Sequence, residues 1–177
     1  MEAVPERLAW AVRTLAIEPA DEVLEIGCGG GVAVALVCPG LGTGRITAID
    51  RSATQTARAE RRNAEDIAAG RAVVRTAALE TAAFDGERFD KIFAVNVNLF
   101  WVRDPAAELR VIGGILKPGG ALYLFYEPPS ADRAGQVAAD LDRVLRRKGF
   151  MTEVSTARTS RRAALLCVKA SLGATPR

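Results

Sequence analysis

Histidine is absent from the chain of 177 residues. Because histidine is the side chain that most readily gains and loses a proton near neutral pH, its absence excludes Ser-His-Asp hydrolysis, Cys-His proteolysis and His-ligated metal sites. Cysteine is scarce as well: Cys28, Cys38 and Cys167 are odd in number and show no C-x-x-C spacing. We therefore expect neither a disulfide framework nor a zinc site.

Long apolar runs are also missing. No run approaches the ~20 residues that a membrane-spanning helix needs. The first residues, MEAVPERLAWAVRTLAIEP, carry three glutamates and lack the apolar core of a signal peptide. We expect no membrane partner and a cytoplasmic location.

The length and composition indicate a single domain. A chain of this size can bury a full core, and 49% hydrophobic and 25% charged residues are ordinary for a globular protein. We expect an N-terminal helix over residues 1–19, the main domain over 20–170 and a disordered tail over 171–177.

Strand-like and helix-like segments alternate along most of the chain. Short apolar runs predict strands, and helical periodicity between N-cap and glycine signals predicts helices. The expected strands are 23–26, 45–50, 72–77, 89–96 and 121–127. The expected helices are 5–16, 32–37, 52–69, 104–116 and 130–149. In the fourth, Asp104 is the expected N-cap and Pro105 lies in the first turn.

The C-terminal part departs from this alternation. Residues 150–158 and 162–170 both resemble strands, and only Thr159, Ser160 and Arg161 separate them. No helix fits between them, so they must pair as antiparallel neighbours. The predicted fold class is α/β, a single-domain doubly wound sheet of five parallel strands closed by an antiparallel C-terminal hairpin. Ligands of such sheets bind beyond the carboxyl ends of the strands, beside the first strand.

Glycines follow that first strand in VLEIGCGGGVAVALV, residues 23–37. A P-loop is excluded because no Gly-Lys-Ser/Thr follows, and a dinucleotide fingerprint counted from Gly27 would place Val32 where a very small residue is needed. The spacing Glu25-x-Gly27-x-Gly29-x-Gly31 instead resembles the first motif of class I S-adenosylmethionine-dependent methyltransferases. The five strands with a closing hairpin are similar to that family too, as is the LKPGG turn at 116–120.

The resemblance implies S-adenosyl-L-methionine as the cofactor. It implies that Glu25 anchors the loop near the methionine end of the cofactor. It also implies that the backbone of Gly27, Cys28, Gly29 and Gly31 lies along the methionine and ribose. Glycine suits such a close approach because it has no Cβ and accepts positive φ.

Two residues at the end of the second strand extend this site. Asp50 lies 23 residues after Gly27, and a carboxylate there can accept hydrogen bonds from both ribose hydroxyls. A plainer alternative is that Asp50 only caps the following helix. The resemblance places Arg51 against the adenine.

The chain departs from the family after the third strand. Ala77 stands where relatives often have an acidic residue that binds the adenine amino group. Three alternatives remain: backbone groups of Ala78 and Leu79 bind the adenine, Glu80 reaches it, or cofactor affinity is low.

The segment NVNLFW follows the fourth strand. The resemblance implies that Asn96 and Val97 border the cofactor and that Asn98, Phe100 and Trp101 face the methyl acceptor. Relatives that use a divalent metal carry acidic ligands in this region, whereas this chain has amides. We therefore expect no metal.

Without histidine, a general base must come from elsewhere. Glu127 and Tyr126, at the end of the fifth strand, are the candidates, although both are also ordinary strand-ending residues. Trp101 is a candidate for stacking on a flat acceptor, and Trp10 for covering the cofactor.

The expected function is methyl transfer to an acceptor, for which we favour a small molecule. Three alternatives remain open. The chain could be a non-catalytic methyltransferase-like module that completes or activates a partner. It could be an RNA methyltransferase, an option that rests only on arginine clusters at 61–62, 146–148 and 158–162. A homodimer could complete an open acceptor site.

Overall fold

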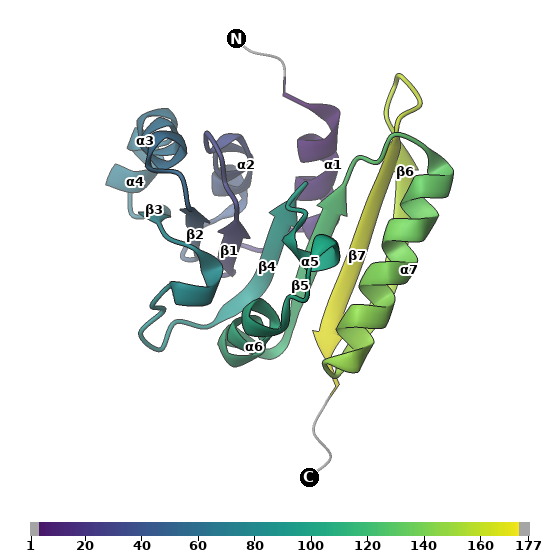
Figure 1. Cartoon of the computed structure of the whole chain (residues 1–177). Coiled ribbons are helices and arrows are strands. Elements are labelled where there is room, and N and C mark those ends of the chain that lie inside the picture. The colour runs from purple at the N-terminus through teal and green to yellow at the C-terminus, as the bar shows by residue number, and fades with distance from the viewer. Residues whose placement is uncertain (1–3, 174–177) are drawn as a thin grey trace.

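The computed structural model describes residues 4–173, which form one seven-stranded sheet with helices on both faces (Figure 1). The strand order is β3-β2-β1-β4-β5-β7-β6. In chain order the strands are β1 (Glu22–Ile26), β2 (Arg45–Asp50), β3 (Ala72–Thr76), β4 (Phe89–Val95), β5 (Leu116–Tyr126), β6 (Phe150–Arg158) and β7 (Ala164–Leu172).

Helices and short 3-10 turns connect these strands. They are α1 (Glu6–Leu15), α2 (Val32–Val37), η1 (Cys38–Gly40), α3 (Ala53–Arg62), α4 (Ala64–Ala68), η2 (Leu79–Thr81), α5 (Leu99–Val102), α6 (Ala106–Ile115) and α7 (Ala131–Arg147). Within residues 4–173, no helix has the length and apolar character needed to cross a membrane.

Strand β1 marks the position where the sheet reverses its order. It pairs in parallel with β2 on one side and with β4 on the other. The connections from these strands therefore leave in opposite directions, and a crevice opens beyond their carboxyl ends. The predicted fold class is confirmed, including the antiparallel hairpin of β6 and β7, and β7 also pairs antiparallel with β5.

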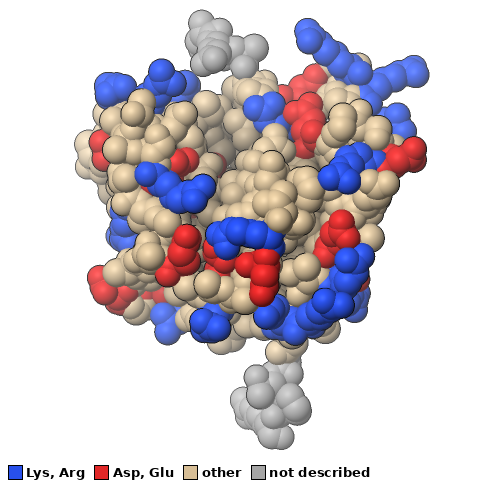
Figure 2. Space-filling model, viewed as in Figure 1, with Lys and Arg blue, Asp and Glu red and all other residues tan. Residues whose placement is uncertain are grey.

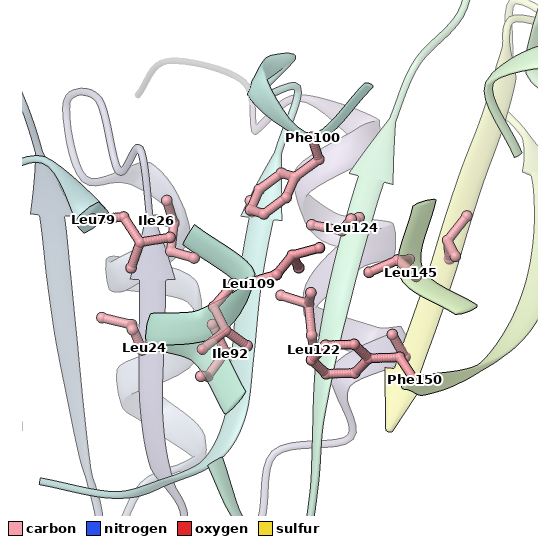
Figure 3. Packing of buried hydrophobic residues seen from close by; sticks show 14 of the residues in the cluster. Leu24, Ile26, Leu79, Ile92, Phe100, Leu109, Leu122, Leu124, Leu145 and Phe150 are labelled. Atoms are coloured by element: carbon pink, nitrogen blue, oxygen red, sulfur yellow. The ribbon is translucent and has the colours of Figure 1, made fainter. Parts of the chain in front are cut away.

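The core has two layers because strand side chains alternate between the faces of the sheet. Ile92, Leu122 and Leu124 point to the face that α5, α6 and α7 cover, as Figure 3 shows for part of this cluster. Phe93 and Phe125 point to the opposite face, against α1 and α2. Adjacent residues of β5 therefore face different layers, which matters for the site at its end.

The predicted continuous helix over residues 52–69 is wrong, because the chain breaks at Asn63 into α3 and α4. The buried Asn63 amide donates to the carbonyls of Ala59, at 2.8 Å, and Gly31, at 3.0 Å. Its backbone, at φ −110°, is no longer helical. The break therefore ties the helix to the glycine loop. Ser52 is the N-cap, as predicted.

Other elements also differ from the sequence prediction. Pro105, not Asp104, is the N-cap of α6, and no side chain caps that end. Helix α5 was not predicted, since its four residues are too short to show periodicity. Strand β5 begins at Leu116 instead of residue 121, and the register of its pairing with β4 shifts across the intervening turn.

The two ends of the chain meet the predictions only in part. Ser171 and Leu172, assigned to a disordered tail, are the last residues of β7. The rest of that tail from residue 174, and residues 1–3 of the N-terminal segment, lie outside the described residues. Helix α1 is fixed at its start, where Glu6 accepts hydrogen bonds from the backbone N–H, at 2.7 Å, and the hydroxyl of Ser160 in the turn between β6 and β7.

Candidate functional site

The glycine loop after β1 is held against the end of β2. The backbone N–H groups of Gly27 and Cys28 both donate to the carbonyl of Ile49, at 2.8 and 3.0 Å. Gly27, Gly29 and Gly31 all have positive φ, at 73°, 52° and 74°. Residues with a side chain rarely adopt this conformation, so the glycine spacing is a requirement of the turn itself.

Asp50 fixes the loop and also lines the crevice. Its Oδ2 accepts from the N–H of Gly29, and its Oδ1 accepts from the N–H of Ser52, each at 2.9 Å. Each carboxylate oxygen keeps a further lone pair. The alternative that Asp50 caps the following helix is wrong, because Ser52 is the N-cap of α3, and Asp50 instead lines a cavity.

Glu25 is a buried carboxyl group with an unsatisfied oxygen. The residue is 3% exposed, and its Oε2 has no hydrogen-bond partner among the described residues. Burial, and then the nearby charge of Asp50, raise the pKa of Glu25 to about 8. Such a carboxyl group is costly to ionise unless a cation approaches it.

Three adjoining cavities surround the carboxyl ends of β1, β2, β4 and β5. The first, of about 500 Å³, extends over Gly27, Asp50 and Leu79. The second, of about 350 Å³, lies beside the end of β5, and the third, of about 200 Å³, lies between Glu25 and α1. Asn96 lines all three, so they meet at the end of β4.

Asn96 is held in an uncommon conformation at this junction. Its φ is 55°, in the left-handed region that asparagine tolerates better than most residues. Its N–H donates to the carbonyl of Phe125 at 2.8 Å, and its side-chain Oδ1 accepts from the N–H of Glu127 at 3.0 Å. The ends of β4 and β5 are therefore fixed together.

The wall of the first cavity beyond β3 is formed by Ala77, Leu79 and Glu80, with Arg51 nearby. Ala78, a predicted adenine contact, is not among the lining residues, and its carbonyl accepts from the N–H of Thr81 at 3.1 Å. Val97 lines the same cavity from beyond the end of β4. Of the sequence alternatives for adenine, Leu79 and Glu80 are the ones that the fold brings to the crevice.

Both predicted bases, Tyr126 and Glu127, line the second cavity, but their interactions differ. The hydroxyl of Tyr126 is buried and donates to the carbonyl of Val97 at 2.8 Å, and burial raises its pKa well above the usual value. A phenol in this state does not readily give up its proton, so these contacts favour a positioning role. Glu127 instead forms an ion pair with Arg7 of α1, at 3.2 Å.

An aromatic group forms another wall of this cavity. Trp101 lies edge-on to Tyr126, with ring centroids 6.5 Å apart, and the guanidinium of Arg133 lies 5.1 Å from the Trp101 ring centroid. Asn98 lines both this cavity and the first. Of the three residues predicted to face the acceptor, Asn98 and Trp101 therefore line cavities at the crevice. The prediction for Phe100 is wrong, because its side chain is buried in the core.

Two aspects of the site were not foreseen. Trp10 does not cover the crevice, because it packs edge-on against Phe125 at 5.6 Å. Arg7 and Arg133 line cavities although no motif includes them. An isolated arginine in the first turn of a helix carries no sequence signal of its contacts, and the fold alone brings these residues to the site.

Comparisons with known proteins agree with this geometry. Residues 23–120, more than half of the chain, match the family model of a methyltransferase domain. No curated protein matches the sequence.

Solved structures resemble nearly the whole chain. One is a SAM-dependent methyltransferase from Aquifex aeolicus, with a TM-score of 0.74, 15% identity and coverage of 92% of this chain and 88% of the other. Precorrin-6y C5,15-methyltransferase from Geobacter metallireducens has a TM-score of 0.72 and 17% identity, with coverage of 95% and 88%. A Geobacter sulfurreducens methyltransferase in complex with S-adenosyl-L-homocysteine has a TM-score of 0.65 and 18% identity, with coverage of 94% and 90%. At such identities the likeness demonstrates the shared fold.

Proposed function

This chain belongs to the methyltransferase domain family, as a class I S-adenosylmethionine-dependent methyltransferase, and we propose that its three adjoining cavities bind the cofactor and a small-molecule acceptor. The observation that carries this proposal is the position of Asn96, which lines all three cavities. The first and third cavities would hold the two ends of the cofactor, and the second would hold the acceptor.

The residues present fit the cofactor. Its adenosine would occupy the larger cavity, with the ribose at Asp50 and the adenine between Arg51 and Leu79. Its methionine end would lie over the glycine loop beside Glu25, whose unsatisfied oxygen suits the cofactor ammonium group. A cation there would favour the ionised form of Glu25, which burial and then the nearby Asp50 disfavour.

When bound, S-adenosylmethionine supplies a methyl group on a sulfonium, whose carbon–sulfur bonding pair remains on sulfur as the methyl group leaves. The chain contributes by holding an acceptor in line with that methyl group, an effect worth up to ~7–11 kcal/mol in well-oriented reactions. Trp101 and Asn98 would orient the acceptor, and Tyr126 would fix the wall through the carbonyl of Val97.

We assign the general base to Glu127. For a hydroxyl or amine acceptor, the acceptor proton would pass to the Glu127 carboxylate as the acceptor lone pair forms the new bond to carbon. Glu127 lines the second cavity and is fixed through its N–H by Asn96. Glu127→Gln should slow turnover without weakening cofactor binding; unchanged turnover would leave orientation alone as the mechanism.

The proposal for the cofactor is tested by calorimetric titration with S-adenosylmethionine and S-adenosylhomocysteine, with NADH as the negative control. We expect micromolar binding of the first two and none of NADH. Asp50→Ala should weaken binding by at least about tenfold, because hydrogen bonds to a charged group contribute ~1.5–3 kcal/mol each.

The matched control is Asp132→Ala, which removes an exposed carboxylate from the first turn of α7. Thermal unfolding of both variants would confirm that they are folded. Unchanged affinity in folded Asp50→Ala would contradict the ribose assignment. Once binding is established, a screen of hydroxyl and amine compounds would identify the acceptor class.

A further inference from the structure

Arg7 lies between two parts of the proposed site. It lines the third cavity together with Glu25 and the glycine loop, and its Nη1 is 3.2 Å from Oε2 of Glu127, which lines the second cavity. The Arg7 side chain is 39% exposed and that of Glu127 is 28% exposed, so neither is locked in the core. One side-chain cation therefore has access to both cavities.

The third cavity presents groups of opposite charge. Both Glu25, which is buried and has an unsatisfied oxygen, and Arg7 line it. An α-amino acid carries an ammonium and a carboxylate on the same carbon, so it can meet both groups at once. Guanidinium groups suit carboxylates because they offer paired N–H donors in a fixed plane.

The position of Arg7 depends on interactions outside the glycine motif. The preceding residue, Glu6, is hydrogen-bonded to Ser160 in the β6–β7 turn. Trp10, one turn further along α1, packs against Phe125 of β5. These interactions fix the helix, so that Arg7 can exchange partners by a side-chain movement alone.

The ion pair with Arg7 is unfavourable for the role that we assigned to Glu127. In the free protein Oε2 of Glu127 contacts Arg7, so this oxygen is not free to contact an acceptor. A base that is paired in the free protein and released by cofactor would act only after the cofactor is in place.

We propose that Arg7 binds the carboxylate of the cofactor's methionine end and in doing so gives up Glu127, so that cofactor binding releases Glu127 to face the acceptor. This inference rests on the proposed function. Arg7 would be a cofactor-binding residue, and cofactor loading and base availability would be coupled through it.

The first experiment compares two ligands by calorimetry. One is S-adenosylhomocysteine, and the other is its decarboxylated analogue, which keeps the adenosine, the thioether and the amine. Arg7→Gln should lose roughly tenfold in affinity for S-adenosylhomocysteine and should bind the analogue as the unmodified protein does. Arg13→Gln, on the exposed side of the same helix, is the control and should change neither.

The second experiment tests the exchange of partners. If Glu127 competes for Arg7, then Glu127→Gln should bind S-adenosylhomocysteine a few-fold more tightly, and this gain should vanish in the Arg7→Gln background. Such a double-mutant cycle isolates the coupling between the two side chains.

The outcomes separate the two proposals. Equal loss of affinity for both ligands in Arg7→Gln, or a Glu127→Gln gain that persists without Arg7, would overturn the role of Arg7. If the unmodified protein binds neither ligand, the proposed cofactor site itself is wrong. Since the pair is partly exposed, we expect all of these variants to fold, and thermal unfolding checks this.

Discussion

Glu25 is a buried carboxyl group, and one of its oxygens has no hydrogen-bond partner among the described residues. Its pKa of about 8 means that the free protein holds this carboxyl group largely protonated at neutral pH. Approach of the cofactor ammonium group would favour the ionised form, so binding at neutral pH should release a proton. Titrations in buffers with different ionisation enthalpies measure this release.

The same residue predicts how stability depends on pH. A carboxyl group whose pKa is raised by folding binds its proton more tightly in the folded state. Its contribution is therefore full below the ordinary pKa of 4.5 and is lost as the pH rises towards 8. We expect the free energy of unfolding to fall over this range, as measured by urea denaturation of the free protein.

Glu25→Gln should remove this decline and make the free protein more stable at pH 8. The absence of histidine makes the test clean, since no imidazole titrates in the same range. Glu65→Gln, on the exposed surface of α4, is the control and should keep the decline. If the free energy of unfolding of Glu25→Gln fell with pH as it does in the unmodified protein, the decline would have to come from other titrating groups.

At the scale of elements, the glycine loop and α3 depend on each other. A Cβ at Gly31 would lie 2.5 Å from the Asn63 side-chain nitrogen and 2.8 Å from the Cα of Ala59. At Gly29, where φ is also positive, a Cβ would meet nothing within 4 Å. The two positions share the backbone requirement but differ in the space available.

Gly31→Ala should therefore destabilise the protein much more than Gly29→Ala. The second variant incurs mainly the cost of a left-handed residue, ~1–2 kcal/mol. Gly31→Ala also displaces Asn63. The buried polar groups that lose their hydrogen bonds would then cost a further ~1–3 kcal/mol. Urea denaturation measures both, and equal losses would show that α3 moves away from the loop at little cost.

The sequence predicts those elements whose cause lies in neighbouring residues, and it does not predict those whose cause lies far away in the chain. Strands β1 to β4 and the closing hairpin were predicted because their apolar runs and turn residues are local. The break at Asn63 could not be predicted, since its cause is a carbonyl of Gly31, 32 residues away. The same holds for the site: motif residues such as Asp50 reach the crevice as predicted, whereas Arg7 is identified only by the fold.

At the scale of the whole molecule, side chains of both charges lie near one another, also at the crevice, where Asp50 and Glu80 lie with Arg51 and Arg103. Figure 2 shows acidic and basic side chains interspersed on this face, with basic groups over the β6–β7 turn and over the end of α7. The exposed basic residues at the β6–β7 turn are Arg158, Arg161 and Arg162, and those at the end of α7 are Arg146, Arg147 and Lys148. They lie at separate corners of the molecule, where no single nucleic-acid strand would follow them easily.

We therefore expect weak RNA binding that disappears at moderate salt, because salt weakens the attraction between basic side chains and phosphates. Electrophoretic mobility of mixed RNA at increasing salt measures it, with Arg161→Ser/Arg162→Ser as a comparison. Retention of binding at physiological salt would favour the RNA methyltransferase alternative.

The three buried cysteines have a consequence for how opening of this protein can be followed. Burial, as the largest cause for each, raises the pKa of Cys28, Cys38 and Cys167 to about 12. Modification by a thiol reagent thus requires that the surrounding structure open first. Each cysteine lies in a different part of the fold: the glycine loop, the start of η1 and strand β7.

The alkylation rates of the three cysteines therefore report local opening at three places in the fold. We expect Cys28 to be alkylated first in the free protein, and S-adenosylhomocysteine to slow it in proportion to ligand saturation, because bound ligand must leave before the loop opens. Mass spectrometry of the alkylated peptides measures the alkylation rate of each cysteine separately. If ligand slows all three equally, the loop opens only when the entire domain does; if it slows Cys28 alone, the cofactor loop opens independently of the sheet that holds it.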